Sequence, residues 1–176
     1  MTMLTIGLAL AVSAAQLPPG HPVPETHCEG QEALLAIYLD MSRILFNERQ
    51  GHRAGEFYEA EFISHNNDEG GDGVSTVRPA DMAAMWNSSK VNEPERQVIN
   101  NLIICKDGLV VAQVTTNGMR TGTDKVRRRY STSAMDIYRF QNGKVVERWG
   151  NNDHITIVRQ TGQPVDLTLT PLPPAK

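Results

Sequence analysis

Apolar residues recur at helical spacing in the first half of the chain. From residue 29 to residue 50 they follow one another at intervals of three or four positions, at Leu34, Tyr38, Met41 and Leu45. Such a stripe predicts one long amphipathic helix over 29–50, and Gly51 supplies its C-terminal stop.

Two shorter segments continue the helical pattern. A second helix over 54–62 is predicted by three aromatic residues at helical spacing, Phe57, Tyr58 and Phe62. Pro79 suits a first helical position, and the residues that then line one face of a third helix are Met82, Met85 and Trp86. Between these helices, the glycine-rich residues 68–76 predict a flexible loop.

The pattern changes to strand type after Glu95. Four runs rich in alternating and β-branched residues predict strands over 97–105, 109–116, 126–141 and 144–149. Lys106-Asp107-Gly108 separates the first two runs and Asn142-Gly143 the last two, which is the turn chemistry of antiparallel hairpins. Helices followed by strands predict an α+β domain whose helices pack on one face of an antiparallel sheet.

The composition limits the partners. The 176 residues carry a formal net charge of −3. This predicts one globular domain without the basic surface that nucleic acid or an anionic membrane requires. The one basic cluster, Lys125 with Arg127, Arg128 and Arg129, is interpreted as a solvated, charged edge where a strand begins.

The two ends of the chain differ in composition from the middle. Residues 1–15 hold an apolar run followed by small residues, the layout of a cleavable secretory signal peptide, although no Lys or Arg precedes the run. Residues 16–28 are rich in proline and predict an extended linker, and residues 164–176 predict a flexible tail. We therefore expect a secreted or periplasmic protein; the alternative is a disordered leader on a cytoplasmic one.

The two cysteines, Cys28 and Cys105, leave two alternatives open. They form one bridge if the protein is exported, or each is a small buried hydrophobe. The five histidines are scattered without the spacing of a zinc site, and no glycine-rich nucleotide-binding motif occurs. We therefore expect neither a metal nor a cofactor.

An acidic residue, Asp136, stands in the middle of an apolar and aromatic strand. Asp is depleted in strands and is costly to bury unpaired, so Asp136 is hydrogen-bonded, protonated or directed at a ligand cavity. Tyr138 and Phe140 have the same strand parity and must share its face. The alternative to a functional acid is a structural one that accepts hydrogen bonds from Tyr130, Ser133 or a backbone turn.

A series of residues around this strand carries a family resemblance. It runs Asp136-Ile137-Tyr138-Arg139-Phe140, Asn142-Gly143-Lys144-Val145-Val146-Glu147, Trp149-Gly150 and Asp153, with Phe57-Tyr58 and Phe62-Ile63-Ser64-His65-Asn66 upstream. In order and spacing, residues 29–163 resemble the SnoaL-like polyketide cyclases of the nuclear transport factor 2-like superfamily.

The resemblance implies a cone-shaped fold, in which three N-terminal helices pack on a strongly curved, mainly antiparallel sheet around a mostly apolar pocket. It implies Asp136 as general acid/base, with His65 as its helper at the pocket mouth, and no metal or cofactor. A carboxyl group in an apolar pocket has a raised pKa, which suits proton transfer. The candidate substrate-binding residues are Tyr58, Asn66, Trp86, Tyr138, Phe140 and Trp149. The resemblance also implies a homodimer formed through the exposed sheet face.

Two features depart from the family. The chain has Glu147-Arg148-Trp149 where the cyclases usually have Glu-His-Trp, and residues 119–126 are shorter and more polar than the family's loop between central strands. Arg148 either points a cation at an acidic ligand group or pairs on the surface with Glu147 or Asp153, and the surface pair is favoured. For Asp153 itself, the favoured interpretation is a cap of a final short helix over 155–159.

Two functions stay open at this level. The first is a cofactor-independent cyclase, isomerase or hydrolase that acts on a small apolar carbonyl compound. The second is a non-catalytic module of the same fold that binds a small hydrophobic molecule or dimerises through its sheet. An Asp136 carboxylate directed away from any cavity would remove the first.

Overall fold

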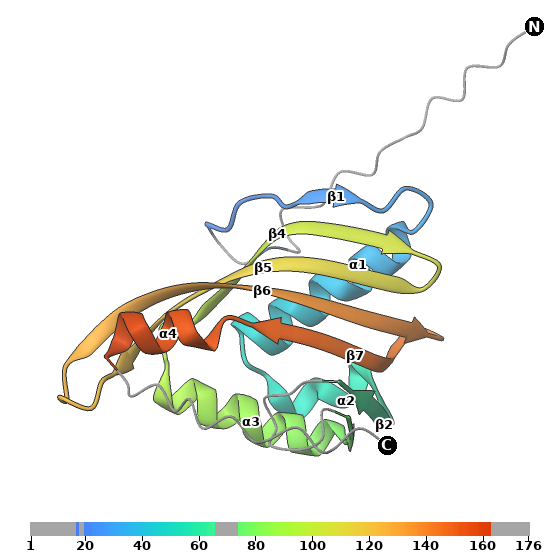
Figure 1. Ribbon diagram of the computed structural model, residues 1–176. Coiled ribbons are helices and arrows are strands. Elements are labelled where there is room, and N and C mark those ends of the chain that lie inside the picture. Colours follow the sequence, from blue (N-terminus) through green and yellow to red (C-terminus); the bar gives the residue numbers. More distant parts are fainter. Residues whose placement is uncertain (1–16, 18–19, 66–73, 163–176) are drawn as a thin grey trace, which may run out of the picture.

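In the computed structural model, the described residues, 17, 20–65 and 74–162, form four α-helices and one seven-stranded sheet (Figure 1). The helices are α1 (Glu32–Met41), α2 (Ala54–Phe57), α3 (Pro79–Asn92) and α4 (His154–Thr161). The strands are β1 (Glu25–His27), β2 (Tyr58–Ser64), β3 (Ser75–Val77), β4 (Gln97–Lys106), β5 (Leu109–Thr121), β6 (Arg127–Gln141) and β7 (Lys144–Asn152). The predicted α+β class is confirmed. The predicted leader (1–15) and tail (164–176) lie outside the described residues, as does Asn66.

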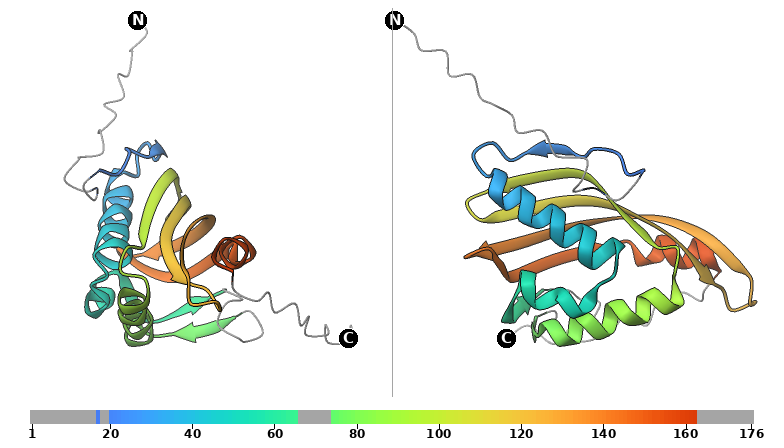
Figure 2. Two further views of the ribbon diagram at one scale, coloured as in Figure 1. Left: turned by 90° about the vertical axis from the view of Figure 1, so that its left-hand side faces the viewer. Right: turned by 180° about the vertical axis from the view of Figure 1, so that it is seen from behind.

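The sheet is mixed and strongly bent. Its strand order is β1-β4-β5-β6-β7-β2-β3, with parallel pairing only at β1–β4 and β2–β7. The long central strands form the two predicted hairpins, and β5 pairs with β6 from Leu109–Arg139 to Thr121–Arg127. Figure 2 shows the sheet curving around α1 and α3, which lie on its inner side. This is the cone expected from the resemblance.

The first helix is shorter than predicted. The stripe predicted one helix over 29–50, but α1 ends at Met41 and the chain continues as a π-helical segment over Ser42–Asn47. At the end of that segment, the Asn47 side-chain amide donates to the Val98 carbonyl (3.0 Å) and accepts from the Val98 N–H (2.8 Å). These two hydrogen bonds connect the end of the π-helical segment to the backbone of Val98 in β4.

The second predicted helix is mostly wrong. Residues 54–57 are helical, but Tyr58–Ser64 forms β2, which pairs with β7 and β3. The aromatic spacing fits a strand as well as a helix, because Tyr58 and Phe62 are an even number of residues apart and share one face of β2. Both side chains are 1% exposed, so burial of that face decides the outcome.

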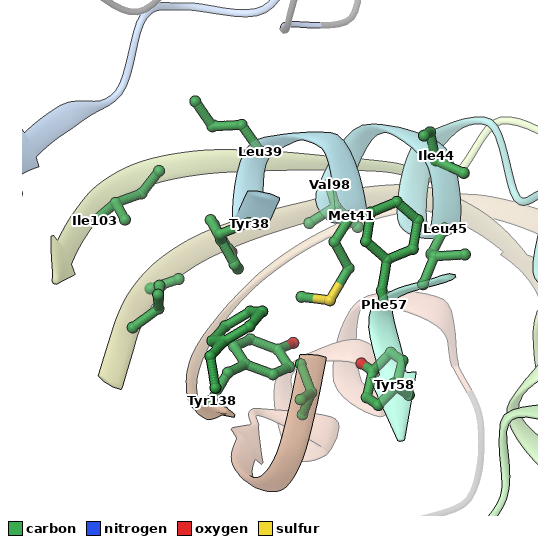
Figure 3. Packing of buried hydrophobic residues seen from close by; sticks show 14 of the residues in the cluster. Tyr38, Leu39, Met41, Ile44, Leu45, Phe57, Tyr58, Val98, Ile103 and Tyr138 are labelled. Carbon is green, nitrogen blue, oxygen red and sulfur yellow. The ribbon is translucent and has the colours of Figure 1, made fainter. Parts of the chain in front are cut away.

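The core lies between α1 and the inner face of the sheet. Figure 3 shows Tyr38 and Met41 of α1 packed above Tyr58 and Tyr138. The Tyr38 and Tyr138 ring centroids are 5.7 Å apart. The Tyr38 hydroxyl donates to Asn100 (2.8 Å), and the Asn100 amide donates to Ser42 (3.0 Å). The buried polar side chains of Tyr38, Asn100 and Ser42 are thus joined in one hydrogen-bonded chain.

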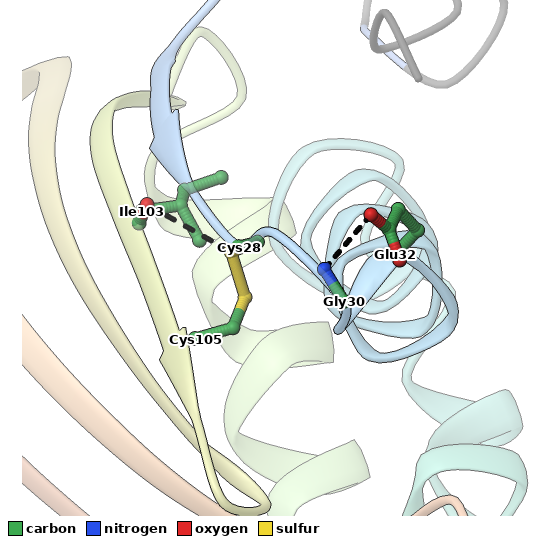
Figure 4. The surroundings of a disulfide bond; sticks show 5 residues. All are labelled: Cys28, Gly30, Glu32, Ile103 and Cys105. Carbon is green, nitrogen blue, oxygen red and sulfur yellow. Dashed lines mark hydrogen bonds between the residues drawn. A yellow bond between two sulfur atoms is a disulfide. The ribbon is translucent and has the colours of Figure 1, made fainter. Parts of the chain in front are cut away.

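A disulfide joins Cys28 to Cys105, which decides between the two alternatives left open by the sequence. It ties the segment after β1 to the C-terminal end of β4, across 77 positions of sequence (Figure 4). Residues Glu25–His27, within the predicted linker, form β1 and pair with Leu102–Ile104. The bond therefore fixes the edge strand of the sheet.

Helix α4 lies beside the first half of β6. Strand β7 ends opposite Ala134, which leaves the first half of β6 without a strand on that side. There the Gln160 side-chain amide accepts from the Ser131 N–H (2.7 Å) and donates to its carbonyl (3.1 Å). Asp153 caps α4 through the Thr156 N–H (3.0 Å), as the sequence predicted. Within the described part of the chain, none of the helices has the length and apolarity to cross a bilayer.

Candidate active site

A cavity of about 300 Å³ lies between the inner face of the sheet and α3, with α4 at one end. Its apolar lining comes from Phe46, Met85, Trp86, Val98, Val114, Tyr138 and Ile157. Its charged lining comes from Glu93, Arg96, Arg120, Asp136 and Arg148, together with His154. Binding sites for small molecules are usually mostly apolar pockets with a few polar or charged groups.

Asp136 borders this cavity. It is partly buried, and its cross-strand neighbours are Ala112 on β5 and Gly150 on β7. Those two residues have little or no side chain, so neither of them fills the space beside the carboxylate. Tyr138 lies on the same face and also lines the cavity, whereas Phe140, two residues further along, is packed in the core. The expectation that the three residues share a face is confirmed.

Arg148 also borders the cavity, so the predicted surface pair is wrong. The residue is only 8% exposed and lies opposite Tyr138. The physical reason is a bulge in β7: Phe140 pairs with Val145, but Arg139 pairs with Glu147, so Val146 is an extra residue. One extra residue reverses the facing of every later side chain in the strand. Arg148 therefore turns inward.

The charges of Asp136 and Arg148 both reach the buried phenols of the core. Burial raises the pKa of Tyr58 to about 12; the positive charge of Arg148 opposes the rise and the negative charge of Asp136 adds to it. Burial also raises the pKa of Tyr138 well above its usual value, and the Asp136 carboxylate raises it further. These phenols stay protonated at neutral pH and can act only as neutral hydrogen-bonding groups.

The opposite end of the cavity is held by a buried carboxylate, Glu93. It accepts hydrogen bonds from the Tyr130 hydroxyl and from Arg120 Nε, the latter at 2.6 Å. Burial, then the bond to Glu93, raises the pKa of Tyr130 to about 12. Arg49 fixes this end by donating to the carbonyls of Glu93, Pro94 and Arg96, at 2.7, 2.7 and 2.9 Å. The end of α3 is thereby clamped in place.

His65 and Trp149 lie on the outer face of the sheet, and neither lines the cavity. Their rings stack with centroids 4.8 Å apart, and His65 Nε2 is 2.8 Å from Glu147 Oε1. Arg139 donates to the other Glu147 oxygen (2.8 Å) and lies over the Trp149 ring. Hydrogen bonds from Arg139, then from His65, lower the pKa of Glu147. The same bulge that turns Arg148 inward turns Trp149 outward.

Of the other two candidate residues, Trp86 and Tyr58, only one borders the cavity. Trp86 lines the cavity from α3. Tyr58 is buried in the core beside it, with ring centroids 6.4 Å apart, and does not border the cavity. Among the described residues, no three His, Cys, Asp or Glu side chains come together as a metal site would require.

The sequence model of one family, the SnoaL-like polyketide cyclases, matches residues 36–161. The chain belongs to this family. Its fold is therefore that of a SnoaL-like protein. No curated protein sequence matches the chain.

Solved structures show the same fold at low identity. A proposed polyketide cyclase from Bacillus cereus ATCC 10987 is 15% identical, with a TM-score of 0.67 over 85% of this chain and 98% of that one. IdmH, a proposed polyketide cyclase from Streptomyces antibioticus, is 16% identical, with a TM-score of 0.63 over 73% and 98%. AclR, a proposed hydroxylase from Streptomyces galilaeus, is 19% identical, with a TM-score of 0.60 over 74% and 96%. At these identities the likeness shows the fold alone, and a fold hosts several activities.

Proposed function

We propose that this SnoaL-like protein is a cofactor-independent cyclase or isomerase that acts on a small carbonyl compound, with Asp136 as its general acid/base. One observation carries the proposal: Asp136 borders a largely apolar cavity, and its cross-strand neighbours are the two small residues Ala112 and Gly150. A positioned carboxylate beside a bound carbonyl compound is sufficient for proton transfer.

The proposed reaction begins with transfer of a proton from the carbon next to the substrate carbonyl to Asp136. The electron pair of the broken C–H bond moves onto the carbonyl oxygen and forms an enolate. In a cyclase the enolate carbon then attacks a second carbonyl of the same molecule, and the resulting alkoxide takes the proton back from Asp136. Asp136 is thus returned to its starting state, and the cavity contributes by holding the two reacting carbons together.

Deuterium exchange tests this function without knowledge of the natural substrate. The probe is 2-tetralone in D₂O, and the measurement is loss of its α-proton NMR signals. We expect the protein to accelerate exchange and Asp136→Asn to slow the catalysed rate by about 10²- to 10⁴-fold, the usual contribution of a general base. Asp136→Glu, which keeps a carboxylate, should retain part of the rate.

The opposite result supports a non-catalytic role. If the protein binds 2-tetralone but exchanges its protons no faster than free acetate at the same concentration, the cavity is a binding site and Asp136 is not a base. Ligand-induced stabilisation of the protein against heat measures binding independently of turnover.

We also propose that the protein works outside the cytoplasm. The Cys28–Cys105 bond supports this, because disulfides persist in oxidising compartments. The N-terminal sequence of material from the native host provides the test: cleavage near residue 15 is expected, and an intact Met1 on all of the folded material would contradict export.

A second copy of the chain is the partner we propose for the outer sheet face. An apolar row crosses that face in register, formed by Ile104, Val111, Ile137 and Trp149. Met135 beside it is 52% exposed. Burying this row in a two-fold dimer would remove it from water. Sedimentation at micromolar concentration should give the mass of a dimer, and Met135→Lys should shift it towards the monomer.

A further inference from the structure

Arg148 places a buried cation at the cavity, close to its aromatic wall. Its Nη1 lies 3.8 Å from the Met82 sulfur, which is a weak acceptor, and its guanidinium also interacts with the Tyr58 hydroxyl. A guanidinium carries five N–H donors, more than one neighbouring carboxylate takes up. Arg148 therefore has the capacity to bind an additional anionic group, whatever else it contacts.

The charge balance of the cavity also favours an anion. Its lining includes three arginines, Arg96, Arg120 and Arg148, and two carboxylates, Glu93 and Asp136. Glu93 is held by Arg120 and by the Tyr130 hydroxyl. The described lining thus has a formal excess of positive charge, although the whole chain has a net charge of −3. The positive charge of the lining would therefore attract a carboxylate ligand, in contrast to the net negative charge of the whole chain.

The walls near Arg148 suit a flat ligand. Tyr138 lies opposite it across the hairpin, and Trp86 faces the same chamber from α3, with Phe46 behind at a ring separation of 5.7 Å. Aromatic walls favour planar, conjugated groups through stacking and edge contacts. We propose that the cavity binds small aromatic or conjugated carboxylates, such as keto acids, and that Arg148 holds the carboxylate.

The strand register supports a productive arrangement. Asp136 is two positions from Tyr138 on β6, so it is a diagonal neighbour of Arg148, at a typical separation of about 7–8 Å. A carboxylate bound to Arg148 leaves the carbon one or two bonds away facing Asp136. As a statement about substrate, this inference rests on the proposed function; as a statement about ligand binding, it is tested by binding alone.

The experiment compares 2-naphthoate with its neutral isostere 2-naphthamide by calorimetry at neutral pH. We expect the wild-type protein to bind 2-naphthoate at least about tenfold more tightly, since hydrogen bonds to a charged group are the stronger ones. Arg148→Met should remove this preference, and Arg148→Lys should keep part of it. Asp136→Asn should tighten 2-naphthoate several-fold and leave 2-naphthamide unchanged, because it removes a competing carboxylate.

Arg96→Met is the matched control at the other end of the cavity, where the charge of Arg96 reaches Tyr130. It should preserve the preference for 2-naphthoate. Equal affinities in the wild type, loss of the preference in Arg96→Met alone, or binding of neither ligand at about 1 mM would each overturn the inference.

Two further outcomes are decisive as well. If Arg148→Met does not fold, the preference of the wild type for 2-naphthoate over 2-naphthamide, together with the results for Arg148→Lys and Asp136→Asn, still tests whether Arg148 binds the carboxylate. If the preference is found but 2-tetralone exchange is not, the carboxylate site stands and the proposed catalytic function fails.

Discussion

Gly118 and Tyr130 face each other across β5 and β6, and the Tyr130 ring occupies the space that a side chain at position 118 would need. A Cβ placed on Gly118 would lie 2.5 Å from the Tyr130 hydroxyl oxygen and 2.6 Å from its Cζ. The same hydroxyl donates to Glu93 at the end of the cavity. A missing side chain on one strand therefore sets the position of a hydrogen-bonding group on the next.

Gly118→Ala should displace the Tyr130 ring and break its bond to Glu93. We expect the free energy of unfolding to fall by about 1–3 kcal/mol, the usual cost of inserting a methyl group into a filled site. Chemical denaturation measures it. Gly55→Ala in α2 is the matched control, because nothing lies within 4 Å of a Cβ there, and it should leave stability unchanged or raise it by up to about 1 kcal/mol. Equal effects of the two variants would contradict the assigned packing.

All four tyrosines of the chain should resist ionisation while the protein is folded. Burial is the largest cause in each case, and it raises the pKa of Tyr58 and Tyr130 to about 12 and that of Tyr38 and Tyr138 well above the usual value. The unfolded phenols ionise near about pH 10. Since the folded state holds these protons more tightly, their contribution to stability is complete below that pH and is lost as the pH rises from there towards 12.

The measurement is phenolate absorbance during an alkaline titration, recorded together with circular dichroism. We expect phenolate to appear only as the fold is lost. A tyrosine that ionises reversibly near about pH 10, with the circular dichroism unchanged, would show that at least one ring is less buried than assigned.

Breaking the Cys28–Cys105 bond should lower stability. It closes a long segment of chain in the unfolded state, so Cys28→Ala combined with Cys105→Ala should reduce the free energy of unfolding by about 2–4 kcal/mol. Dithiothreitol should lower the stability of the wild type to a similar extent and leave the double variant unaffected. A reductant effect of equal size in both proteins would mean that the bond is not its target.

His65→Ala should affect stability but not catalysis. The ring stacks on Trp149 and bonds to Glu147 outside the cavity, so its loss should cost about 1 kcal/mol of unfolding free energy while 2-tetralone exchange changes less than about twofold. Asp136→Asn should show the reverse pattern. If His65→Ala slows exchange as much as Asp136→Asn does, the helper role implied by the family resemblance is right and the outer placement does not describe the working state.

The strands and the facing of Asp136 could be predicted from the sequence because both depend on local rules. Asn142-Gly143 fixes a tight hairpin, and alternation along β6 places Asp136 and Tyr138 on one face whatever surrounds them. Alternation along the chain does not predict a bulge in the partner strand β7, which changes the face on which later side chains lie. If the pairing were regular, with Val146 opposite Arg139, Trp149 would lie opposite Asp136 and Arg148 would point outward, which is the facing that the sequence analysis expected of these two residues.

The helix boundaries failed for a different reason. Tyr58 and Phe62 satisfy helical and strand periodicity equally, and only pairing with β7 distinguishes the two. The loss of α-helical geometry after Met41 likewise depends on a distant group, the Val98 backbone that Asn47 satisfies. Tertiary partners of this kind leave no signal in the segment itself.

The side-chain amide of Gln160 has a consequence for how the molecule behaves at high concentration. It bonds to both the backbone N–H and the backbone carbonyl of Ser131. This residue lies in the part of β6 that has no pairing with β7. An exposed strand edge is a template for a strand from another molecule, and here that template is blocked by two bonds from one residue. The helix that carries Gln160 thus protects the protein from the edge-to-edge aggregation to which a long, bent hairpin is prone.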